Sequence, residues 1–291
     1  MGEDKLVNAV LNPGGQMVLS AAAGNFESQP ANILKVALYS ARWGFPVEDR
    51  TLNLMREEAP SSVSLPSKSV ARALKCALRT AAPPKFFRVL ESAGCLACCY
   101  PEIAALVGTP QLPSYHPEGD VFEHTMIVLD RVCAKTTSPM VRFAALVHDL
   151  GKALTPRDDL EHRGHENRTG GVLENWKARA ALPASWWQAG QLVGQLHMLV
   201  PRITTPAQIV AIFDQVLASP LSLAELVLIC QADDMTGAKQ PPDLSDCLCA
   251  YTAVGESDAP GGLSPRERLT WVRNQRYEAV ARVYSAGHNP S

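Results

Sequence analysis

Four residues in the middle of the chain combine metal-binding side chains with positions at the ends of apolar segments. They are His124, the adjacent pair His148 and Asp149, and Asp233. The pair follows the apolar run 144–147, so both side chains are expected beside a packed core. Burying an imidazole and a carboxylate without compensation is costly, and a divalent cation compensates both. We therefore predict one metal site formed by these four residues, with Mg, Mn, Ni, Co, Fe or Zn as candidate ions.

Two further histidines and one lysine accompany this set. His165 follows the polar segment 155–164, and His197 is predicted to lie deep in an apolar helix over 190–200. We predict that both histidines hold a second ion, bind a phosphate group or protonate a leaving oxygen. Lys152 follows Asp149 closely in the sequence and is predicted to stabilise charge on phosphoryl oxygens. An exposed loop lysine is the alternative interpretation of Lys152.

Helices are the elements that the sequence predicts around these residues. Hydrophobic residues make up 46% of the 291 residues and aromatic residues 6%, a composition that favours helices over a β-rich core. Apolar positions recur at helical spacing from residue 32 onward, and no alternating strand pattern of convincing length occurs. The predicted fold class is therefore all-α.

The clearest break in the first half of the chain is the segment 109–120, which contains three prolines and a glycine. We predict a smaller helical bundle over residues 1–110 and a metal-binding helical bundle over 111–240. A loop and a C-terminal helix are predicted over 241–291. That helix is expected to begin at a capping box, with Ser264 as N-cap, Pro265 in the first position and Glu267 in the third.

Charge and cysteine content narrow the class of protein. The net charge of −2 and the lack of a long basic run predict no whole-molecule attraction to nucleic acid or membrane, which leaves weak local RNA contact. The eight cysteines do not form two well-spaced pairs, so we interpret them as reduced thiols rather than zinc ligands. No N-terminal apolar signal and no run of 18 apolar residues occurs. We expect a cytoplasmic protein without a membrane partner.

Several segments resemble the HD superfamily of metal-dependent phosphohydrolases. Within it, they are similar to the HD-bearing tRNA nucleotidyltransferases, the CCA-adding enzymes, in the parts that follow the catalytic head. The resemblance covers about residues 10–240. It is carried by PEIAALVGTPQLPSYHPEGDVFEHTMIVLDRV (101–132), VRFAALVHDLGKALTP (141–156), HRGHENRTGG (162–171) and CQADDMTG (230–237).

The resemblance implies an HD helical bundle preceded by neck helices, with phosphohydrolase activity on a nucleotide or an RNA-end phosphoester. A 2′,3′-cyclic phosphate, a 2′-nucleotide and a phosphate monoester are the substrate classes it implies. Asp234 is the alternative to Asp233 as the last ligand. Two other functions remain open: a di-iron oxygenase using the same ligands, and a non-catalytic RNA-binding module. In the latter, Arg266, Arg273 and Arg276 of the last helix would contact phosphates.

Two departures separate the chain from the polymerising members of that family. Residues 1–120 contain no paired carboxylates beside a phosphate-binding glycine loop. The junction motif that the family writes as Glu-Asp-Pro-x-Arg-x-Leu-Arg reads SQPANILK here. Ser28 and Gln29 replace the two acids, and Asn32 and Lys35 stand where arginines are expected. We therefore expect a protein that kept the hydrolytic half and does not add C or A to tRNA.

Overall fold

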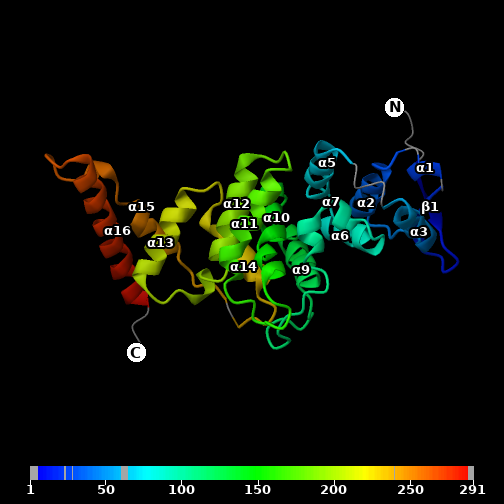
Figure 1. The fold of residues 1–291 in the computed structure, drawn as a ribbon. Coiled ribbons are helices and arrows are strands. Elements are labelled where there is room, and N and C mark those ends of the chain that lie inside the picture. The colour runs from blue at the N-terminus through cyan, green and yellow to red at the C-terminus, as the bar shows by residue number, and fades with distance from the viewer. Residues whose placement is uncertain (1–5, 23, 28, 60–64, 239, 288–291) are drawn as a thin grey trace. The chain divides into compact units, whose positions relative to one another are not determined.

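The computed structural model describes residues 6–22, 24–27, 29–59, 65–238 and 240–287, and these are predominantly helical, as predicted (Figure 1). The chain forms two compact units, residues 1–195 and 196–291. The domain boundaries near residues 110 and 240 remain predictions. Among the described helices, none is both long and apolar enough to cross a membrane. Ser28, one of the replaced junction acids, lies outside the described residues.

The first unit begins with an antiparallel hairpin of β1 (Val7–Leu11) and β2 (Met17–Ala21), in which Val10 pairs with Val18. β2 buries most of its side chains, whereas β1 is exposed along nearly its whole length. The sequence does not predict this hairpin because neither five-residue strand shows the in-and-out alternation of a half-buried strand.

Short helices form the rest of the N-terminal part of this unit: α1 (Gly24–Glu27), α2 (Asn32–Trp43), α3 (Asp49–Glu57), α5 (Ser67–Ala77), α6 (Pro83–Ser92), α7 (Leu96–Cys99) and α8 (Pro101–Ala104). α2 packs against α5 and α6. The rings of Phe86, Phe87 and Tyr100 meet edge to face, with centroids 5.2–6.0 Å apart. They lie fully buried in an apolar core that aliphatic side chains of the same helices complete.

The helices that carry or directly precede the predicted site residues follow: α9 (Val121–Cys133), α10 (Pro139–Val147), the 3-10 helix η1 (Leu150–Leu154), α11 (His165–Lys177) and α12 (Ala184–Leu196). Asp120 caps α9 by accepting a hydrogen bond from the Glu123 amide at 3.0 Å, and Ser138 caps α10. α9 packs on α10, and η1 packs on α11. The end of α10 leads through His148 and Asp149 into η1, and the start of α11 lies against η1.

The second unit contains η2 (Val200–Arg202), α13 (Pro206–Leu217), α14 (Leu223–Asp233), α15 (Ser245–Thr252), η3 (Glu256–Asp258) and α16 (Pro265–Gly287). The predicted capping box of α16 is confirmed. The Ser264 amide donates to Oε2 of Glu267 at 2.8 Å, and the Glu267 amide donates to Oγ of Ser264 at 3.4 Å. Arg276 ties α16 to α15, because its guanidinium lies 4.5 Å from the centre of the Tyr251 ring.

Candidate metal centre

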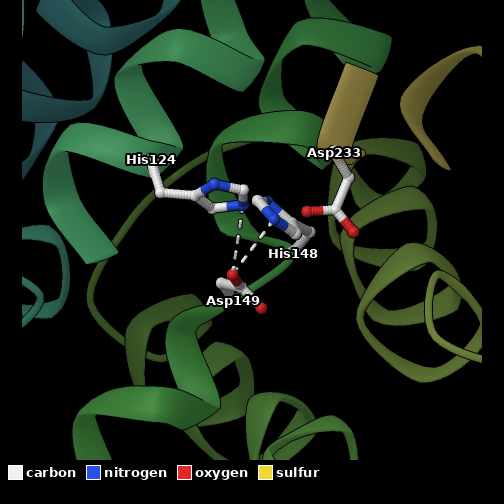
Figure 2. Close-up of side chains that lie close together, drawn as sticks. All are labelled: His124, His148, Asp149 and Asp233. Atoms are coloured by element: carbon white, nitrogen blue, oxygen red, sulfur yellow. Dashed lines mark ion pairs between the residues drawn. The ribbon is translucent and has the colours of Figure 1, made fainter. Parts of the chain in front are cut away.

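His124, His148 and Asp149 reach the same point from the ends of two helices. His124 lies in the first turn of α9, His148 follows the last residue of α10, and Asp149 precedes η1. All three are buried, with at most 1% of their surface exposed. Each offers one ligand atom, and these atoms lie within 4.8 Å of one another (Figure 2). The first unit thus brings together three of the four predicted ligands.

The Asp149 carboxylate is the centre of this cluster. Its Oδ2 lies 3.2 Å from Nε2 of His148 and 3.7 Å from Nε2 of His124. Its Oδ1 lies 3.1 Å from Nε2 of His165, the first residue of α11. The Lys152 ammonium reaches Oδ2 at 2.7 Å. One carboxylate therefore faces three imidazoles and one ammonium group.

Backbone carbonyls fix the rings of His148 and His165. Nδ1 of His148 lies 2.8 Å from the Ala145 carbonyl oxygen, and Nδ1 of His165 lies 2.9 Å from the His162 carbonyl oxygen. Because a carbonyl oxygen can only accept, both Nδ1 atoms carry a proton and donate it. In the neutral imidazole, the lone pair is then on Nε2, which faces Asp149.

The ring of His124 is fixed in the same sense by a carboxylate. Its Nδ1 lies 2.6 Å from Oε1 of Glu118, so Nδ1 donates and Nε2 faces Asp149. Burial raises the pKa of Glu118, but hydrogen bonds from the His124 ring and from the Glu118 backbone amide, with the charges of His124 and His116, bring the pKa below its usual range. Glu118 is therefore ionised, and its carboxylate accepts the hydrogen bond from Nδ1 of His124.

This donor set fits a divalent cation. Imidazole nitrogens and carboxylate oxygens that converge in a buried site repel one another unless protons or a cation lie between them. Nε2 of His124 and His148 with an oxygen of Asp149 is a ligand set that suits Mg²⁺ least and first-row transition metals best. Binding of such an ion replaces any protons on the Nε2 atoms, so it is coupled to proton release.

Asp149 stays charged in this buried position. Burial raises the pKa of its carboxyl group, but the adjacent His148 ring and the Lys152 ammonium hold that pKa well below its usual range. Lys152 is itself buried and donates a further hydrogen bond to Oε1 of Gln111 at 2.7 Å. The alternative interpretation of Lys152 as an exposed loop lysine is therefore wrong.

Gly151 allows η1 to approach α11 at backbone distance. A Cβ atom at this position would lie 2.0 Å from the His165 carbonyl oxygen and 2.8 Å from the Thr169 amide nitrogen. The Gly151 amide donates to Oγ1 of Thr169 at 3.0 Å. The structure requires glycine at this position because no side chain fits.

The remaining predicted residues belong to the second unit. His197 is buried, but α12 ends at Leu196, so His197 lies in the turn after the helix and not deep within it. Asp233, also drawn in Figure 2, is the last residue of α14, as predicted. Oδ1 of Asp234 accepts the amides of Thr236 and Gly237 at 3.0 and 2.9 Å, so this carboxylate shapes the following turn.

Three supporting side chains were not predicted from the sequence: Glu118, Gln111 and Thr169. Glu118 and Gln111 come from the segment 109–120, which its prolines identified only as a break between helices. The feature of the sequence that could have pointed to Glu118 and Gln111 is that this proline-rich segment also contains side chains able to form hydrogen bonds. Thr169 lies one turn after His165 on α11 and accepts the Gly151 amide; its spacing from His165 places both on one helix face.

The arginines of α16 differ in their surroundings. Arg276 donates to the Val254 carbonyl at 3.0 Å and to the Tyr251 hydroxyl at 3.1 Å, which gives it a structural role within the second unit. Arg266 and Arg273 are exposed. A contact with phosphates therefore remains a prediction for these two residues and is disfavoured for Arg276.

Comparison with known proteins identifies an HD domain and a set of relatives. The family model of the HD domain matches residues 121–219. A multifunctional CCA protein of Paraburkholderia phymatum is 36% identical over 275 residues, which cover 89% of this chain and 66% of the relative. The multifunctional CCA protein of Burkholderia lata is 34% identical over 308 residues, covering 98% of this chain and 75% of the relative. The chain thus spans about two thirds to three quarters of the length of these relatives.

Solved structures support the same fold. A structure described as a CCA-adding enzyme in apo form I covers 90% of this chain and 58% of its own chain, with a TM-score of 0.54 and 16% identity. A complex of a tRNA-processing enzyme covers 91% of this chain and 65% of its own, with a TM-score of 0.50 and 11% identity. At these identities the likeness concerns the fold alone.

Proposed function

This chain belongs to the family of the multifunctional CCA proteins and carries an HD domain, and from this premise we propose that it is a metal-dependent phosphohydrolase. The proposed substrate is a nucleotide or an RNA-end phosphoester such as a 2′,3′-cyclic phosphate. Relatives named as CCA proteins make RNA the expected source of that phosphoester.

One observation carries the proposal. A buried, ionised carboxylate, that of Asp149, faces the Nε2 atoms of His124, His148 and His165, and each of these rings donates its Nδ1 proton to a fixed acceptor. A site that served only stability would satisfy such groups in separate places, because burying charged groups together costs more than burying apolar ones. Their convergence supports a role in holding a cation.

The residues of the cluster have distinct proposed roles. His124, His148 and Asp149 hold a divalent ion, which when bound supplies a water of lowered pKa and polarises a phosphoryl oxygen. His165 lies on the other oxygen of Asp149, where it holds a second ion, binds phosphate or protonates the leaving oxygen. Lys152 offsets the charge of Asp149, and we propose that it also stabilises the phosphoryl oxygens.

Two residues of the second unit complete the proposal. Asp233 is the proposed fourth ligand, because it ends α14 at the place that the sequence order of the HD family gives the last ligand. Oδ1 of Asp234 accepts amides of the next turn, and its Oδ2 accepts the Gln240 side-chain amide at 3.1 Å. His197 is proposed to act with His165 toward a second ion or a phosphate. The assignment of Asp233 rests on sequence order, and that of His197 on sequence order and on its burial.

We also propose that residues 1–291 alone do not add C or A to tRNA. Polymerisation requires paired carboxylates that hold metal ions at a nucleoside triphosphate, and residues 1–120 lack such a pair beside a glycine loop. Incorporation of labelled CTP into tRNA lacking its 3′ end, by the purified chain, is the direct measurement. Any incorporation above background refutes this part of the proposal.

The hydrolytic activity is tested by metal analysis combined with a substrate screen. The purified chain is stripped with chelator, reloaded with Mg²⁺, Mn²⁺, Co²⁺, Ni²⁺ or Zn²⁺, and assayed on 2′,3′-cyclic, 2′- and 3′-nucleotides. Hydrolysis is expected to disappear on chelation and to return with at least one ion. A folded, metal-loaded protein that hydrolyses none of these substrates would contradict the proposed activity.

A further inference from the structure

The three imidazoles that face Asp149 donate their Nδ1 protons to different kinds of hydrogen-bond acceptor. His148 and His165 donate to backbone carbonyl oxygens, which no side-chain substitution removes. His124 donates to the side-chain carboxylate of Glu118 at 2.6 Å. Of these three rings, the orientation of His124 is thus the one that a replaceable side chain controls.

Glu118 is itself held in place by a second histidine. Its Oε1 also lies 3.2 Å from Nδ1 of His116, and the His116 ring meets the His124 ring nearly at right angles, with centroids 4.6 Å apart. Side-chain exposure falls from 20% at His116 through 8% at Glu118 to 0% at His124. A hydrogen-bonded row therefore leads from the partly exposed segment before α9 to the buried ring.

These three residues also have the composition of a separate metal site, but their geometry favours a hydrogen bond. Two ligands of one ion lie about 3 Å apart or more, because bonds of about 2.0–2.2 Å leave the ion at wide angles. The 2.6 Å between Nδ1 of His124 and Oε1 of Glu118 is shorter and matches a charge-assisted hydrogen bond. Glu118 therefore acts on His124 and not on an ion of its own.

We propose that Glu118 is a positioning residue that fixes the tautomer of His124 and so sets the metal affinity of the centre. By accepting the Nδ1 proton, the carboxylate keeps the lone pair on Nε2, which lies 3.7 Å from Oδ2 of Asp149. Without this acceptor, the proton can move to Nε2 and point at Asp149, where it blocks ligation. This inference rests on the proposed function in one respect, namely that His124 binds the ion.

The test measures Mn²⁺ affinity on the metal-free full-length chain by calorimetry. Removing the carboxylate partner of a metal-binding histidine typically weakens the metal site ~10–100-fold, and we expect this loss for Glu118→Ala. Glu118→Gln should bind closer to wild type, because its amide oxygen still accepts the Nδ1 proton. Glu123→Gln is the matched control: it neighbours His124 on α9, but its carboxylate pairs with Arg88 at 2.6 Å. Its affinity should match wild type.

A second measurement reads the tautomer directly. Nitrogen NMR of histidine-labelled, metal-free wild type should show His124 protonated at Nδ1, and Glu118→Ala should shift the proton toward Nε2. Wild-type Mn²⁺ affinity in folded Glu118→Ala protein overturns the proposal, as does a His124 ring protonated at Nε2 in wild type. If Glu118→Ala fails to fold, Glu118→Gln and the wild-type spectrum decide. A wild type that binds no ion instead contradicts the proposed function, while the spectrum still tests the role of Glu118.

Discussion

The two halves of the first unit bury polar side chains in different ways. In the N-terminal half, Asn32, Ser40 and Thr51 are buried at separate positions. The Asn32 side-chain amide donates to the Asn25 carbonyl at 2.6 Å. The Ser40 hydroxyl donates to the Phe45 carbonyl at 2.7 Å, and Thr51 accepts the Ala21 amide at 2.9 Å. The Ser40 contact joins α2 to the loop that follows it, and the Thr51 contact joins α3 to β2.

In the half that begins with α9, one group of buried polar side chains meets, whereas Arg142 is buried apart from it on backbone carbonyls. Three histidines and a lysine from four elements approach the two oxygens of Asp149. Both halves bury polar groups at similar depth, so burial alone does not identify a functional site. The convergence of charged groups on one point supports our proposal of a functional site, because burying charged groups together is a weak source of stability.

The largest expected effect comes from Asp149→Ala. Even partners of a ligand are typically worth ~10–100-fold in affinity or activity, so loss of the ligand itself should remove metal binding and hydrolysis of a 2′,3′-cyclic nucleotide. Circular dichroism should remain helical because the apolar helices still pack. Metal content, helicity and turnover are measured on the same samples, and full turnover in folded, metal-poor protein would place the chemistry elsewhere.

Lys152→Met removes the ammonium that lies against Asp149. Breaking a buried ion pair typically costs about 3–5 kcal/mol, and we expect this loss in the free energy of unfolding of the metal-free protein. Adding Mn²⁺ should narrow the difference from wild type, since the ion supplies positive charge at Asp149. Turnover should fall while metal stays bound, because an ammonium is not a ligand. An equal loss of stability with and without Mn²⁺ would argue against the idea that Lys152 and the ion both compensate the charge of Asp149.

Thr51→Val tests the other half of the comparison. The valine keeps the shape but leaves the buried Ala21 amide without its acceptor, which costs about 1–3 kcal/mol. Denaturant unfolding should show this loss, whereas calorimetry on the folded protein should show unchanged Mn²⁺ affinity. Weaker metal binding in this variant would mean that the two halves are coupled and that their buried polar groups do not act separately.

The smallest effect is expected from Glu123→Gln. Its ion pair with Arg88 is about 40% exposed on both sides, and such surface pairs contribute roughly 0–1 kcal/mol. Thermal unfolding should shift little, and turnover should stay at the wild-type level. A large loss of activity here would extend the functional cluster beyond the buried groups around Asp149.

The residues at the ends of helices were predicted well from the sequence. His124, His148 and Asp149 follow caps and apolar runs that are visible in the residues themselves, so their placement needed only helical register. The capping box at Ser264 was equally local. A metal-binding role could be inferred because the residue types and their order were enough to suggest convergence.

Contacts that depend on the path of a loop were beyond the sequence. Glu118 and Gln111 reach the cluster only because the segment 109–120 folds back beside α9 and η1. His197 was assigned to a helix interior because apolar residues surround it, but α12 ends just before it. The exposed strand β1 carried no alternation to detect.

The fit of Gly151 against the His165 carbonyl bears on how a mutational scan of this chain should be interpreted. Any side chain at that position would force η1 away from α11 and separate Asp149 from the His165 ring. Every substitution at residue 151 would then score as inactive, although glycine contributes no atom to the chemistry. Ranking positions by lost activity would place this residue beside Asp149, and only a parallel readout of folding or abundance would separate a spacer from a ligand.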